Sequence, residues 1–200
     1  MTHPQSQNSI HTIMNKAAFL DRDGVINIDL GYVYSKEKII FNRGIFSFLK
    51  FLIKHNFKIF VVTNQSGISK GFYTEKQFWE LTEWIDLALL SRGIEITKTY
   101  FAPYDPVRDF QSVKYDSYDR KPNPGMILKA QKEFGIDLAN SILIGDKISD
   151  VQAGISAGVG FNILLSKTKE CVDECIYIAS SFAKAKKEIE KFTFEKGGAI

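Results

Sequence analysis

The sequence contains little cysteine, no long apolar run and little net charge. Two cysteines, Cys171 and Cys175, cannot build a disulfide framework, which fits the reducing cytoplasm. No apolar run approaches the length of about 20 residues that spans a bilayer, and residues 1–15 lack the features of a secretory signal. With 26 basic and 23 acidic side chains, the net charge of +3 does not indicate a nucleic-acid partner. We therefore expect a monomeric cytoplasmic protein that binds neither membranes nor nucleic acids.

The length and composition are those of one globular domain. Of the 200 residues, 44% are hydrophobic and 24% are charged. At roughly 150 residues per domain this length predicts a single domain, which can bury a core without disulfides. Residues 1–15 are polar and aperiodic, so we expect them to form a disordered extension. We place the domain at residues 16–192 and expect a flexible tail over residues 193–200.

Short apolar runs alternate with segments of helical periodicity along the chain. Strands are predicted near residues 17–20, 58–63, 97–101, 141–145 and 161–165, and helices near 44–55, 74–92, 124–134, 149–157 and 181–191. This alternation is typical of an α/β protein with a Rossmann-like parallel sheet and helices on both faces. In such a sheet the ligand lies beyond the carboxyl ends of the strands. A loop over residues 102–122 is long enough to be functional.

Polar side chains follow three of the predicted strands, and a pair of cations closes the long loop. Asp21 and Asp23 follow the first strand, and they could form a turn or serve as a nucleophile and a general acid or base. The second strand ends in hydroxyl and amide side chains that suit either a capping turn or an anion site. The cations Arg120 and Lys121 could be a solvated pair, and Asp146, after the fourth strand, could be a helix cap. The side chains that end the second strand are Thr63, Asn64, Gln65 and Ser66.

The four positions together indicate one site, because the carboxyl ends of parallel strands open onto one crevice. Asp21, Asp23 and Asp146 would repel one another there without a counterion, so a divalent cation is implied. Ligands that are all oxygen atoms, with a phosphate as substrate, favour Mg²⁺ over Zn²⁺.

These motifs, in this order, resemble those of the haloacid dehalogenase superfamily of phosphatases. The resemblance covers residues 16–191 and implies the fold of that superfamily without a cap domain. Within it, the chain is most similar to the heptose bisphosphate 7-phosphatases, and histidinol phosphatases share much of the pattern. The segments that carry the resemblance are AAFLDRDGVIN (17–27), DLGYV (29–33), VVTNQSGI (61–68), RKPNPGM (120–126) and IGDKISDVQAG (144–154).

The resemblance implies a role for each matching residue. Asp21 would attack phosphorus and Asp23 would act as general acid and then base, while Thr63 and Lys121, supported by Arg120, hold the phosphoryl oxygens. Mg²⁺ would be held by Asp21, the Asp23 carbonyl and Asp146. The substrate would be D-glycero-D-manno-heptose 1,7-bisphosphate, on the route to nucleotide-activated heptose for surface polysaccharide. The substrate contacts expected are Asp21, Arg22, Asp23, Asp29, Leu30, Gly31, Tyr32, Thr63, Asn64, Gln65, Ser66, Arg120, Lys121 and Lys147.

The pattern departs from the superfamily relatives in the long loop, where they often hold a structural zinc through cysteine and histidine. The matching positions here are Ala102, Tyr104, Ser117 and Asp119, of which only the last is a reasonable ligand. We therefore expect no structural zinc.

Three other functions compete with this interpretation. Histidinol-phosphate phosphatase shares the catalytic motifs, and a polynucleotide 3′-phosphatase shares them too but requires a basic groove. A signalling receiver domain, which is not an enzyme, would need an acceptor aspartate near the end of the third strand, where this chain has Tyr100, Phe101 and Ala102.

Overall fold

The protein is a three-layer α/β structure built on one parallel sheet. The computed structural model describes residues 15–105, 107, 118–168 and 176–197. The sheet has the order β3-β2-β1-β4-β5-β6. The strands are β1 (Lys16–Leu20), β2 (Phe57–Asn64), β3 (Lys98–Ala102), β4 (Ile142–Gly145), β5 (Phe161–Leu165) and β6 (Ile176–Ala179). Every described pair of neighbouring strands is parallel, which confirms the predicted fold class.

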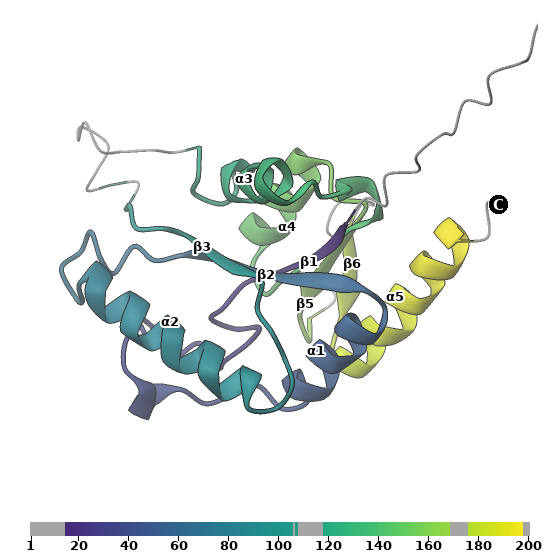
Figure 1. Cartoon of the computed structure of the whole chain (residues 1–200). Coiled ribbons are helices and arrows are strands. Elements are labelled where there is room, and N and C mark those ends of the chain that lie inside the picture. Colours follow the sequence, from purple (N-terminus) through teal and green to yellow (C-terminus); the bar gives the residue numbers. More distant parts are fainter. Residues whose placement is uncertain (1–14, 106, 108–117, 169–175, 198–200) are drawn as a thin grey trace, which may run out of the picture.

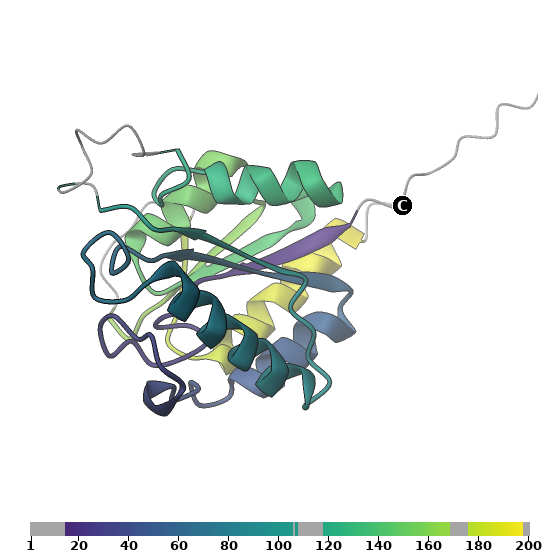
Figure 2. The same cartoon turned by 60° about the vertical axis from the view of Figure 1, so that its left-hand side comes forward.

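Helices cover both faces of the sheet (Figure 1). The helices α3 (Gly125–Phe134) and α4 (Ile148–Ala157) lie on one face. The opposite face carries α1 (Ile45–Lys54), α2 (Glu75–Leu90) and α5 (Phe182–Gly197), and the turned view in Figure 2 shows the same layers. Two short 3₁₀ turns, η1 (Lys36–Lys38) and η2 (Leu138–Asn140), lie in the connections. Among the described residues, no helix has the length and apolar character that crossing a membrane requires.

The central strand β1 contributes to the hydrophobic core on both faces. Ala18 and Leu20 pack into the cluster under α1, α2 and α5, whereas Ala17 and Phe19 pack into the cluster under α3 and α4. These side chains are fully buried, because successive residues of a strand point to opposite faces and both faces are covered. An apolar run without alternation is therefore what this position in the sheet requires.

The ends of the domain differ from the boundaries predicted from the sequence. Asn15 is paired with the fold, because its carbonyl accepts a hydrogen bond from the Asp137 N–H at 2.8 Å and its amide donates to the Phe134 carbonyl at 3.0 Å. The helix α5 continues to Gly197, past residue 193, where the sequence predicts that the tail begins. Phe192 stacks on Phe161 with ring centroids 5.1 Å apart, which anchors this last part of the helix. Residues 1–14 and 198–200 lie outside the described residues.

Candidate active site

A cavity of about 470 Å³ opens at the carboxyl ends of the central strands. Side chains from loops after β1, β2 and β4, together with residues 120–122, form its wall. Its lining residues are Asp21, Asp23, Asp29, Gly31, Tyr32, Thr63, Asn64, Gln65, Ser66, Tyr73, Arg120, Lys121, Pro122, Lys147, Ser149 and Asp150. The cavity therefore lies where the topology of a parallel sheet predicts a ligand site.

A buried lysine lies between two buried carboxylates at the base of this cavity. Lys121 Nζ is 2.9 Å from Asp21 Oδ1 and 2.7 Å from Asp150 Oδ1, and it also donates to the Val62 carbonyl at 2.7 Å. A buried charge is stable only when it is paired and hydrogen-bonded, and these contacts use all three donors of the ammonium group. One cation thus neutralises part of the negative charge of two carboxylates.

Burial and neighbouring charge act in opposite directions on these groups. Burial raises the pKa of Asp21 to about 7, and the ammonium group of Lys121 offsets part of that rise. Burial alone would lower the pKa of Lys121, but the adjacent Asp21 and Asp150 carboxylates raise it above its usual value. Lys121 therefore remains a cation, and Asp21 is a carboxylate whose ionised form needs more positive charge than Lys121 supplies.

Three carboxylates could hold a metal ion beside this lysine. Asp21, Asp146 and Asp150 each offer an oxygen atom within 4.8 Å of the others. Asp146 Oδ1 is buried without a hydrogen-bond partner, as expected of an atom whose partner is an ion. Asp150 has both oxygens engaged, one with Lys121 and the other with the Lys147 N–H at 3.0 Å, so it serves better to position Lys121 than to bind metal directly.

Gly24 provides the space that the Asp146 carboxylate occupies. Its φ of +97° favours glycine, and a Cβ atom there would lie 2.1 Å from Asp146 Oδ2. The residues present thus fit an oxygen-ligated divalent cation such as Mg²⁺, with Asp21 and Asp146 as its carboxylate ligands.

Several donors hold the Asp23 carboxylate in place. Asn27 donates to Asp23 Oδ1 at 2.9 Å, and Arg22 donates to both oxygens at 3.2 and 2.7 Å. Gln65 Nε2 donates to Asp23 Oδ2 at 3.1 Å. Asp23 is therefore fixed at the cavity wall by neighbours on its own loop and by the loop after β2.

The loop after β2 positions both the hydroxyl and the lysine of the site. Gln65 Nε2 donates to Thr63 Oγ1 at 2.8 Å, so the proton of the Thr63 hydroxyl is available to a ligand in the cavity. The Asn64 side chain makes two hydrogen bonds with the Lys121 backbone, at 3.0 and 3.1 Å. These two bonds hold residues 120–122 beside the strand ends although they come 57 positions later in the chain.

An ion pair and an aromatic side chain form the rim. Lys147 Nζ lies 3.0 Å from Asp29 Oδ2, and the Gly31 N–H donates to Asp29 Oδ1 at 2.9 Å. Partial burial would raise the pKa of Asp29, but these bonds have the larger combined effect and lower it. Tyr32, at a φ of +48°, accepts a hydrogen bond from Lys70 at 2.8 Å. The rim thus presents one strongly basic side chain, Lys147, to the cavity.

Most residues predicted as substrate contacts line the cavity, and two do not. Arg22 is buried and does not line the cavity; it donates to Asp23 and to the Val33 carbonyl, and its guanidinium packs over the Phe78 ring. Leu30 is not among the residues that line the cavity, and it is 53% exposed. Arg120 lines the cavity and donates to the Tyr104 carbonyl at 2.8 Å.

Sequence reasoning missed Tyr73, Pro122, Ser149 and Asp150 as lining residues. Asp150 follows Asp146 by one helical turn, which was a usable signal. The sequence offered no such signal for Tyr73, because this residue reaches the cavity from an irregular loop. Of the positions considered for zinc, Asp119 forms an ion pair with Lys129, and residue 117 lies outside the described residues. The absence of a structural zinc stays a prediction.

Comparison with known proteins agrees with this geometry. A HAD-hydrolase-like family model matches residues 118–171. The D-glycero-alpha-D-manno-heptose-1,7-bisphosphate 7-phosphatase of Burkholderia mallei is 47% identical over 76% of this chain and 80% of its own length. The D-glycero-beta-D-manno-heptose-1,7-bisphosphate 7-phosphatase of Escherichia coli K12 is 38% identical over 88% of this chain and 94% of its own length.

The fold is also that of a solved heptose bisphosphate phosphatase. The D,D-heptose 1,7-bisphosphate phosphatase from B. bronchiseptica, complexed with magnesium and phosphate, superposes with a TM-score of 0.75. The match covers 88% of this chain and 98% of that chain at 24% identity, which shows a shared fold. The chain therefore belongs to the D-glycero-D-manno-heptose-1,7-bisphosphate 7-phosphatase family of HAD-like hydrolases.

Proposed function

We propose that this protein removes the 7-phosphate of D-glycero-D-manno-heptose 1,7-bisphosphate with Mg²⁺ through an aspartyl-phosphate intermediate. As a member of this family the protein is a phosphatase. The observation that carries the proposal is the placement of Asp21 at the base of the cavity, in contact with a buried lysine and beside the unpaired oxygen of Asp146. This arrangement places a nucleophile next to a cation, Lys121, and next to a carboxylate that can bind a metal ion, Asp146.

In the first step an oxygen of Asp21 attacks phosphorus, and the bond between phosphorus and the sugar oxygen breaks. Asp23, which lines the same cavity two residues later, gives a proton to the departing sugar oxygen. The positive charge of Lys121 stabilises the phosphoryl oxygens electrostatically and the Thr63 hydroxyl donates to them, where negative charge is spread in the transition state. Fixed donors in a largely buried site cost little reorganisation during the reaction.

In the second step Asp23 accepts a proton from water, which attacks the phosphorus of the aspartyl-phosphate. The products are inorganic phosphate and the regenerated Asp21 carboxylate, so atoms and charge balance over the cycle. Mg²⁺ bound by Asp21 and Asp146, with the Asp23 carbonyl as a further ligand, would supply Lewis-acid stabilisation of the phosphoryl charge.

A second phosphate on the substrate has a basic partner at the rim. Lys147 lines the cavity. Burial would lower the pKa of Lys147, but the ion pair with Asp29 and the other carboxylates nearby together have the larger effect and raise it, so Lys147 is a cation at neutral pH. Arg120 adds a second cation to the wall. These two side chains favour a bisphosphate over histidinol phosphate, which carries one phosphate only. We place the reaction in the cytoplasm, in the supply of nucleotide-activated heptose for surface polysaccharide.

Phosphate release with Mg²⁺ from a small substrate panel tests the proposal. The panel contains both anomers of the heptose bisphosphate, histidinol phosphate and a 3′-phosphorylated oligonucleotide. We expect preference for one heptose anomer, and we expect Asp21→Asn to fold normally and lose essentially all turnover. Preference for histidinol phosphate would move the protein to histidine biosynthesis. Substantial turnover by Asp21→Asn would refute the nucleophile assignment.

A further inference from the structure

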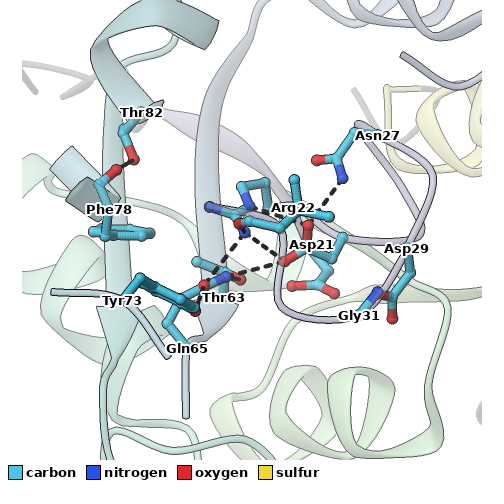
Figure 3. Close-up of polar contacts among 12 residues, drawn as sticks. Asp21, Arg22, Asn27, Asp29, Gly31, Thr63, Gln65, Tyr73, Phe78 and Thr82 are labelled. Atoms are coloured by element: carbon cyan, nitrogen blue, oxygen red, sulfur yellow. Dashed lines mark hydrogen bonds and ion pairs between the residues drawn. The ribbon is translucent and has the colours of Figure 1, made fainter. Parts of the chain in front are cut away.

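Every hydrogen-bonding position of the Gln65 side chain is occupied by a protein group. Its Oε1 accepts from the Tyr73 hydroxyl at 2.5 Å and from Arg22 at 3.3 Å. Its Nε2 donates to Thr63 Oγ1 at 2.8 Å (Figure 3). It also donates to Asp23 Oδ2 at 3.1 Å. An amide has two acceptor and two donor positions, so none remains for substrate. Gln65 therefore connects other side chains, although the sequence predicted it as a substrate contact.

The hydroxyl that holds Gln65 most closely belongs to a clamped ring. Tyr73 is 4% exposed, and Tyr34 stacks on it with ring centroids 5.5 Å apart and planes at 17°. On another side the ring approaches Gly67, where a Cβ atom would lie 2.3 Å from Tyr73 Cε1. Burial raises the pKa of Tyr73 to about 12, so its hydroxyl stays protonated and donates.

We propose that Tyr73 is a positioning residue that acts through Gln65 on Asp23. Without the Tyr73 hydroxyl, Gln65 Oε1 keeps only the 3.3 Å contact with Arg22. Arg22 cannot compensate by moving, because it also donates to Asp23 and to the Val33 carbonyl. The Gln65 amide then loses its fixed position, and with it the donor shared by the Asp23 carboxylate and the Thr63 hydroxyl.

This inference rests on the proposed role of Asp23 as the acid that protonates the leaving group. A sugar oxygen is a poor leaving group and needs that proton, whereas p-nitrophenolate leaves as a stable anion and does not. A defect in positioning Asp23 should therefore depend on the leaving group. A general loss of structure would slow both reactions alike.

The test compares kcat/KM of Tyr73→Phe for the heptose bisphosphate and for p-nitrophenyl phosphate. We expect a loss of about tenfold for the sugar phosphate and less than about twofold for the aryl phosphate, since positioned acids contribute 10²–10⁴-fold in total. Tyr34→Phe is the matched control, because it keeps the stacked ring and leaves the Tyr73 hydroxyl in place. Equal losses on both substrates, or no loss on either, would overturn the proposal.

A double-variant cycle identifies the group through which Tyr73 acts. If the path runs through Asp23, adding Tyr73→Phe to Asp23→Asn should cause no further loss on the sugar phosphate. Additive losses would overturn the path. Thermal unfolding reports whether Tyr73→Phe folds normally. If it does not, Gln65→Met removes the same link from its other end and should show the same dependence on the leaving group. If the wild type prefers histidinol phosphate, the proposed substrate fails, yet the test still runs because that leaving group is also an alkoxide.

Discussion

Removing the charge of Lys121 should destabilise the whole fold in the absence of metal. Lys121→Met keeps most of the side-chain volume but leaves Asp21 and Asp150 buried and adjacent without a cation. Breaking a buried ion pair by removing one partner costs about 3–5 kcal/mol. For a domain of this size, each kcal/mol lowers Tm by roughly 2–4 °C, so we expect a fall of about 10 °C.

The measurement is urea and thermal unfolding in EDTA at pH 8, above the pKa of about 7 that Asp21 has beside Lys121. Lys98→Met is the control, because Lys98 forms an exposed ion pair with Glu133 and should change stability by less than about 1 kcal/mol. Adding Asp150→Asn to Lys121→Met should recover part of the loss, since one uncompensated charge is removed. If Lys121→Met is as stable as Lys98→Met, then Lys121 does not stabilise the fold by neutralising the buried Asp21 and Asp150 carboxylates, and the reasoning is refuted.

Two further predictions test a buried acid and a glycine. Burial raises the pKa of Asp86 to about 6, so its favourable contribution to folding is complete below pH 4 and is lost as pH rises through 6. Asp86→Asn should thus stabilise the protein at pH 7.5 by about 1 kcal/mol, after discount for its partial exposure, and by nothing at pH 4 in urea unfolding. Gly24→Ala should weaken Mg²⁺ binding in calorimetry by about tenfold, because its Cβ would displace Asp146, whereas Gly71→Ala, also at positive φ but in open space, should not. Unchanged affinity in Gly24→Ala would contradict the metal assignment.

The fold and the convergence of the site followed from the sequence because both depend on short-range patterns. Apolar runs that alternate with helical segments specify a parallel sheet, and its geometry brings the strand ends together. Asp21 and Thr63 each lie at the end of a central strand, so their meeting needed no knowledge of side-chain packing. The helix predicted near residues 74–92 begins after Thr74, which forms a capping box with Gln77.

Contacts made by loops could not be predicted in this way. Lys121 meets Asp150 from 29 positions away, and no spacing rule relates a loop to the first turn of a helix. Tyr73 enters the cavity because the ring fits against Gly67, which is a property of packing alone. The end of α5 was placed too early because the contact between Phe192 and Phe161 that extends it is a tertiary one.

The strand order has a consequence for synthesis of the chain on the ribosome. Of the six strands in this sheet, β1 is made first, and it lies in the centre, between β2 and β4. Once residues up to Ala102 have emerged, β1, β2 and β3 can pair, but the other edge of β1 stays open until Ile142–Gly145 is made. That edge is apolar and without charge over Ala17–Leu20, which makes it a template for pairing with other chains. About forty residues are made between the end of β3 and β4, which takes about 2–8 seconds at roughly 5–20 residues per second. During that time the open edge of β1 is the part of the nascent chain that a chaperone would need to protect.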